Sequence, residues 1–154
     1  MIIHEMTRTE IDVVLSESRL GRLACVKDGR PYVVPIHYAF AENYLYSFSL
    51  MGQKIEWMRL NPWVCVQVDQ FSGKRTWRSV VVNGVFHELP ENPVMRFDRG
   101  HAWDLLKKRV DWWEPGGLKP SSQYSMKAPE TIFYRIRIES ASGRQATVDD
   151  EFYR

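Results

Sequence analysis

The sequence predicts a mainly β protein, a small closed or half-closed antiparallel barrel of about six strands with short helices between them. Two observations predict this fold class. Alternating apolar and polar residues recur in short runs that Gly, Pro and Asn separate, which is typical of half-buried strands. The chain has 154 residues, enough for one domain but too few for two full sheets, so the sheet is expected to curl on itself. We therefore treat residues 1–154 as a single domain.

The first expected element is a helix that begins near residue 8. Thr7 is a good N-cap, and Glu10, three residues later, completes a capping box. Met6 and Ile11 are placed to form the hydrophobic staple that often accompanies such a cap. Gly21 is expected to end this segment, and from there the hydrophobic period changes to two.

A hairpin follows, with strands at 23–26 and 32–38. Asp28 and Gly29 lie between them, and this pair supplies the positive φ angles that tight hairpin turns require. Pro35 has no backbone N–H, so we expect it at a bulge, at a sheet edge or against a ligand.

Further strands and helices are predicted from the same periodicities. Gly84 indicates a bulge or bend inside a long strand, and Asn61 with Pro62 ends a helix. The predicted strands are 44–50, 64–69, 77–89 and 131–139, and the predicted helices are 52–60 and 93–110.

The composition excludes several classes of function. The formal net charge of +2 is too small for a protein whose main task is to bind a nucleic acid or an anionic membrane. No apolar run reaches membrane-helix length and no signal peptide is recognisable, so a cytoplasmic location is expected. Cys25 and Cys65 show no metal or redox spacing and are interpreted as buried free thiols without chemistry. The 6 Trp, 7 Tyr and 7 Phe are more aromatic rings than a small core needs, so some of them are candidates to bind a flat ligand.

The strongest local signal is a strand that leads through Gly52 into a helix with Lys54 in its first turn. A lysine opposes the helix dipole there, and a phosphate held by free N–H groups would remove that conflict. The other interpretation is a solvated surface lysine at a small energetic cost.

Two aromatic segments are weaker candidates for a binding site. Trp77, Arg78 and Ser79 could border a flat ligand with polar edges, although strand packing with a surface arginine is the commoner arrangement. Trp112 and Trp113 are adjacent in a loop rich in Pro and Gly, so one of them is expected to cover a ligand or a second subunit.

In combination, these segments resemble the pyridoxamine 5′-phosphate oxidase-like family of FMN-binding split β-barrels, in particular its small branch that includes nitroimidazole-resistance proteins. The spacing from Gly52 and Lys54 to Asn61 and Pro62 is the most specific part. The other matching segments, in family order, are 21–26, 28–31, 34–38, 45–46, 78–84 and 131–144.

The resemblance implies a homodimer with two shared flavin grooves and a small-molecule substrate. FMN is the implied cofactor, although some relatives bind F420 or haem. The positions that match the family's flavin contacts are Val34, Pro35, Ile36 and His37 along the ring, Ser47, Phe48, Ser49, Gln53 and Lys54 around the ribityl chain and phosphate, and Trp77, Arg78 and Ser79 near the polar edge of the ring.

The implied function is that of a flavin-dependent oxidoreductase, with Lys54 anchoring phosphate and no side chain assigned as acid or base. Pyridoxine-phosphate oxidation is not expected, because Gln53 stands where the vitamin-oxidising enzymes carry an arginine. The alternatives are a non-catalytic flavin- or haem-binding protein, an F420-dependent reductase, and a barrel without cofactor.

Overall fold

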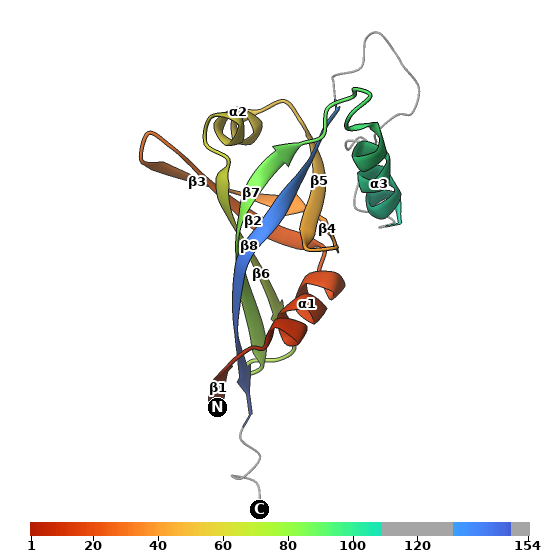
Figure 1. Cartoon of the computed structure of the whole chain (residues 1–154). Coiled ribbons are helices and arrows are strands. Elements are labelled where there is room, and N and C mark those ends of the chain that lie inside the picture. Colours follow the sequence, from red (N-terminus) through yellow and green to blue (C-terminus); the bar gives the residue numbers. More distant parts are fainter. Residues whose placement is uncertain (109–130, 149–154) are drawn as a thin grey trace, which may run out of the picture.

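The computed structural model describes residues 1–108 and 131–148, which form an antiparallel sheet with helices at its ends and side (Figure 1). The sheet runs in the order β3-β2-β6-β7-β8-β5-β4, and β1 pairs with β8. The strands are β1 Ile2–Glu5, β2 Leu20–Lys27, β3 Arg30–His37, β4 Ala39–Ala41, β5 Tyr44–Leu50, β6 Trp63–Phe71, β7 Trp77–Glu88 and β8 Thr131–Thr147, and the helices are α1 Arg8–Glu17, α2 Gln53–Leu60 and α3 Arg96–Lys107.

The predicted mainly β class is confirmed, and the sheet is open between its edge strands β3 and β4, as in a split barrel. The predicted strand number was wrong, because the described residues form eight strands rather than six. All four residues of β1 are exposed, and β4 has three residues, so neither carries an alternating core pattern. β8 also continues to Thr147, beyond the predicted end at residue 139, because its polar second half pairs with both β1 and β7.

The start of α1 is as predicted. The Thr7 side chain accepts a hydrogen bond from the Glu10 N–H, and the Glu10 carboxylate accepts one from the Thr7 N–H at 2.7 Å. Met6 and Ile11 lie in one buried cluster, where the predicted staple would place them. The predicted helix 93–110 is shorter, since α3 begins at Arg96, and residues 109–110 lie outside the described range.

The predicted hairpin of β2 and β3 turns at Asp28 and Gly29, whose φ angles are 51° and 72°. Pro35 lies opposite Arg22 on β3, which is an edge strand. Because the other side of β3 has no strand partner among the described residues, a proline whose nitrogen faces that side removes no hydrogen bond from the sheet.

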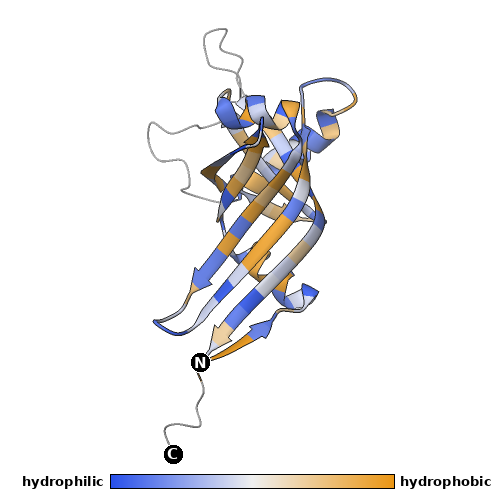
Figure 2. Ribbon diagram, turned by 90° about the vertical axis from the view of Figure 1, so that its left-hand side faces the viewer, coloured by the Kyte–Doolittle hydropathy of each residue, from blue (hydrophilic) through white to orange (hydrophobic). Residues whose placement is uncertain are grey.

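Two hydrophobic clusters hold the sheet together. In the larger cluster, α1 contributes Ile11, Val14 and Leu15 and α2 contributes Ile55 and Met58, and these two helices lie toward opposite ends of the sheet (Figure 1). In the smaller cluster, α3 packs on β5 and β8. Hydrophilic and hydrophobic residues alternate along the strands (Figure 2), so one face of each strand serves the core.

Gly84 marks the predicted irregularity. The register between β7 and β8 shifts between Asn83 and Gly84. A Cβ at Gly84 would lie 2.5 Å from the backbone oxygen of Arg137. The close approach of β7 to β8 therefore requires a residue without a side chain at this position.

Replacing Gly84 with alanine is expected to lower the free energy of unfolding by about 2 kcal/mol or more, because backbone must move to admit the methyl group. Gly100→Ala is the matched control, since Gly100 is an exposed residue of α3 with no atom within 4 Å of the position that a Cβ would take. That change should raise stability by up to about 1 kcal/mol. Urea denaturation of both variants checks the difference, and equal midpoints would contradict this account of the bulge.

Candidate functional site

The N-terminus of α2 has backbone N–H groups that no side chain caps. Its N-cap, Gly52, makes no side-chain capping bond, and the Gly52 carbonyl accepts from the N–H groups of Ile55 and Glu56. Space beside Gly52 is open, with nothing within 4 Å of the position that a Cβ would take. Uncapped N–H groups at a helix N-terminus favour an anion.

Lys54, in the first turn of α2, is half-buried. Burial lowers the pKa of its ammonium group, and the nearby thiol of Cys25 opposes this shift. Lys54 has neither an ion pair nor a hydrogen bond with any residue of the described ranges. A desolvated cation beside uncapped N–H groups is stabilised by a bound anion, so these residues fit a phosphate group. Gln53, next to Lys54, is exposed.

Strand β3 offers a second set of free backbone groups. It pairs with β2 along one edge, and its other edge has no strand partner among the described residues. Ile36 is buried, Val34 and His37 are half-buried, and Pro35 is exposed. Burial lowers the pKa of the His37 imidazole. The free edge can hydrogen-bond to the polar rim of a flat ligand.

The residues predicted on β5 divide between its two faces. Ser47 and Ser49 are buried, and their hydroxyls donate to the carbonyl oxygens of His37 at 2.6 Å and Leu50 at 2.7 Å. Phe48 points to the other side, where its ring lies 5.5 Å from that of Phe133 in the cluster under α3. The structure therefore does not bring Phe48 together with the two serines.

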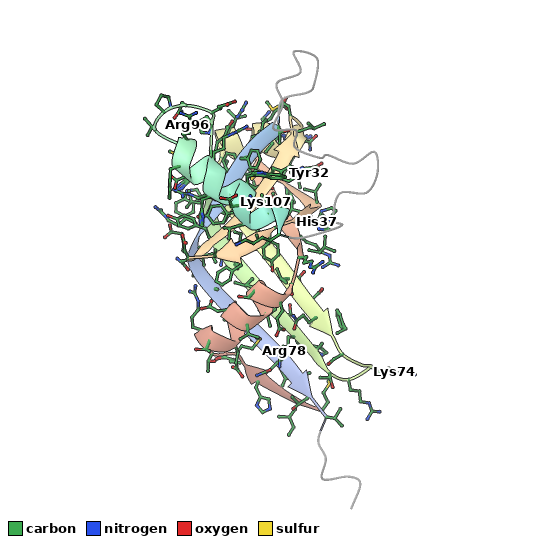
Figure 3. All side chains as sticks on the ribbon, turned by 90° about the vertical axis from the view of Figure 1, so that its right-hand side faces the viewer. Tyr32, His37, Lys74, Arg78, Arg96 and Lys107 are labelled. Carbon is green, nitrogen blue, oxygen red and sulfur yellow. The ribbon has the colours of Figure 1, made fainter. Side chains whose placement is uncertain are left out.

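The three residues predicted at the start of β7 also lie on two faces. Arg78 lies near Glu10 of α1. The pKa of Glu10 is lowered mainly by its hydrogen bond from the Thr7 backbone, and the positive charge of Arg78 lowers it slightly further. Trp77 and Ser79 face the opposite side, where they line a hollow of about 530 Å³ together with Glu5, Ser142 and Arg144 among others. Arg78 lies toward the same end as Lys74, away from His37 (Figure 3). One copy of the chain therefore does not join these residues to the β3 and α2 group.

Some functional signals were missed or cannot be placed. Nothing in the local sequence shows that Ser47 bonds to His37, ten residues away. Cys25 is buried as predicted, but Cys65 is only half-buried, and both thiols are free. Trp112 and Trp113 lie outside the described residues. Within those residues no group of three or more His, Cys, Asp or Glu could hold a metal ion, and no helix is long and apolar enough to span a membrane.

Comparison with known proteins identifies the family. The family model described as pyridoxamine 5′-phosphate oxidase matches residues 7–145. The chain belongs to this family. An uncharacterized protein of Rhizobium meliloti (strain 1021) is 47% identical over 146 residues, which cover 95% of this chain and 97% of that protein.

Solved structures agree with the family assignment. A FAD-binding protein of Mesorhizobium loti is 48% identical, with a TM-score of 0.79 over 96% of this chain and 100% of that one. A protein of Bacteroides thetaiotaomicron, with a proposed role in 5-nitroimidazole antibiotic resistance, is 18% identical with a TM-score of 0.69 over 94% of this chain and 89% of that one. The second likeness concerns the fold alone.

Lys54→Met is expected to stabilise the ligand-free protein of this pyridoxamine 5′-phosphate oxidase family member by about 0.5 kcal/mol or more. The change keeps the apolar stem and removes a desolvated charge. Because the pKa of Lys54 is lowered in the folded state, the gain should shrink as pH rises and the wild-type amine loses its proton. Urea denaturation at two pH values checks this, and a lower stability of the variant near neutral pH would show that Lys54 is satisfied without a ligand.

Proposed function

We propose that this protein is a flavin-dependent oxidoreductase that binds its flavin through the FMN moiety, as FMN itself or as part of FAD. The observation that carries the proposal is the half-buried Lys54 beside the uncapped N-terminus of α2 and the open space at Gly52. The family supports the proposal, and the 48% identical M. loti protein is a FAD-binding protein.

The residues have separate roles in this proposal. The Lys54 ammonium and the first N–H groups of α2 neutralise and hold the phosphate. The free edge of β3, from Val34 to His37, offers backbone groups to the polar rim of the ring. A bound flavin would supply hydride or electron transfer, and the protein would supply orientation and exclusion of water. Gln53, exposed at the same helix start, is placed to contact the phosphate or ribityl chain.

A second copy of the chain completes the groove in this proposal. Trp77 and Ser79 lie on the outer face of the sheet, away from Lys54, so they would reach the flavin from the partner subunit. The outer face also carries exposed apolar side chains: Leu20 is 42%, Val33 59% and Trp63 64% exposed. Such a surface gains free energy when a second subunit covers it.

Flavin binding tests the site directly. Purified protein is loaded with FMN or with FAD, and flavin absorbance and dissociation constants are measured for wild type, Lys54→Met and Lys74→Met. Lys74 is an exposed residue of the β6–β7 turn and serves as the matched control. Lys54→Met should weaken binding about tenfold or more, as expected for a lost charge-assisted contact, and Lys74→Met should not. A Soret band, or equal affinities, would contradict the proposed site.

Reduction of the bound flavin tests the enzymatic part. Flavin-loaded protein is mixed anaerobically with NADH or NADPH, and bleaching of the flavin band is followed. Bleaching, followed by reoxidation with an added electron acceptor, supports an oxidoreductase. A flavin that neither nucleotide reduces, and that no tested acceptor reoxidises after chemical reduction, would favour a storage or sensing protein.

Light scattering tests the homodimer. Wild type should have the mass of two chains. Ala24 is half-buried in the outer face of β2, where the second subunit is proposed to pack, so Ala24→Arg would place a bulky charge in the interface. This change should shift the mass toward that of the monomer and lower flavin occupancy. Val94→Arg is the control, since Val94 is 83% exposed outside the sheet. A wild-type monomer with full flavin occupancy would overturn the shared groove.

A further inference from the structure

We infer that Ser47 is a positioning residue that fixes the end of the flavin-facing segment of β3, at the corner where β3 passes into β4. This inference rests on the proposed flavin function. Ser47 is 2% exposed, so its hydroxyl is buried and is not offered to a ligand at the surface. The hydroxyl donates to the His37 carbonyl oxygen at 2.6 Å.

This hydrogen bond lies at the corner where β3 passes into β4: His37 ends β3, Ala39 begins β4, and Ala39 pairs with Tyr46, the chain neighbour of Ser47. β3 forms one end of the sheet, and β5 lies beside β4 at the other end. No ladder joins β3 to β5 in the described residues, so the Ser47 side chain links two strands that the sheet leaves unpaired. The bond therefore anchors the corner two residues before the first β4–β5 pair.

The peptide group between His37 and Tyr38 is held on both sides. Its carbonyl accepts from Ser47, and its N–H, which belongs to Tyr38, donates to the Arg19 carbonyl at 3.0 Å. Because a peptide group is planar, two opposed hydrogen bonds fix its orientation. The ladder with β2 directs the preceding residues of β3, and this peptide plane fixes the end of the strand, where the backbone groups of His37 are presented.

The polar neighbour of Ser47 on the adjoining strand is Tyr134. Tyr134 lies opposite Ser47 in the β5–β8 register, and its hydroxyl is fully buried. Burial raises the pKa of Tyr134 to about 12, and the polar Ser47 side chain partly offsets that shift. Tyr134 therefore stays protonated at any ordinary pH, and in the structure its hydroxyl makes no hydrogen bond to the His37 carbonyl, which accepts from Ser47 instead.

A matched pair of variants separates positioning from ordinary stability. Ser47→Ala removes the bond to the His37 carbonyl. Tyr38→Phe removes a buried hydroxyl bond at the same corner, from Tyr38 to the Leu15 carbonyl at 2.9 Å, which ties the corner to α1 and leaves the His37 carbonyl bonded. Each change deletes one hydroxyl donor to a buried carbonyl, so both should lower the urea midpoint to a similar degree.

The measurements are the FMN dissociation constant, the reduction potential of the bound flavin and amide hydrogen exchange at residue 38. Ser47→Ala should weaken FMN binding roughly three- to tenfold, shift the potential and speed exchange at residue 38. Tyr38→Phe should leave the FMN dissociation constant within twofold of the wild-type value. It should leave the reduction potential unchanged within error. Equal binding and potential in the two variants would overturn the inference.

The inference about Ser47 can still be tested if the flavin proposal itself fails. In that case wild type binds neither FMN nor FAD, and amide exchange of the ligand-free proteins decides. Faster exchange at residue 38 in Ser47→Ala than in Tyr38→Phe would then support the positioning of the peptide plane, and equal exchange would overturn it.

Discussion

The pairing of β7 with β8 is the constraint on which the remaining structure depends. β8 is 17 residues long and pairs with β7 along most of its length, with β5 in its first half and with β1 in its second. The bulge at Gly84 lets the two strands approach and bend together, since bulges increase local twist. A sheet bent in this way curls without closing, and β3 and β4 remain as its edges. The candidate site uses one of these edges.

Sequence patterns predicted the parts of this fold that local chemistry determines. The bounds of β5, the capping box at Thr7 and the turn at Asp28 follow from period, cap and turn residues, and the structure has all three. The short strand β1 and the second half of β8 could not be predicted in this way. Their residues lack an alternating core pattern, and they become strands because a long-range partner is present.

The spatial arrangement of the candidate site residues could not be predicted in the same way, because adjacency in a strand does not show which side chains lie close together. Trp77 and Ser79 point to one face of β7 and Arg78 to the other, as any three successive strand residues must. Lys54 could be singled out from the sequence because a lysine in the first turn of a helix opposes the helix dipole. The contact of Ser47 with His37 depends on the corner between β3 and β4 and on the register of β4 with β5, which only the three-dimensional structure shows.

The polar groups that the barrel buries indicate what this fold is built to do. Lys54 loses hydration without gaining an ion pair in the described residues, and the Tyr134 hydroxyl is fully buried without a hydrogen bond there. Apolar residues at either position would serve stability better. Natural proteins keep such local conflicts where a ligand or a required geometry compensates for them. In the proposed site, an anion near the open space at Gly52 compensates for the buried lysine. The tyrosine hydroxyl lies opposite Ser47, whose own hydroxyl holds the His37 peptide group in the inferred orientation.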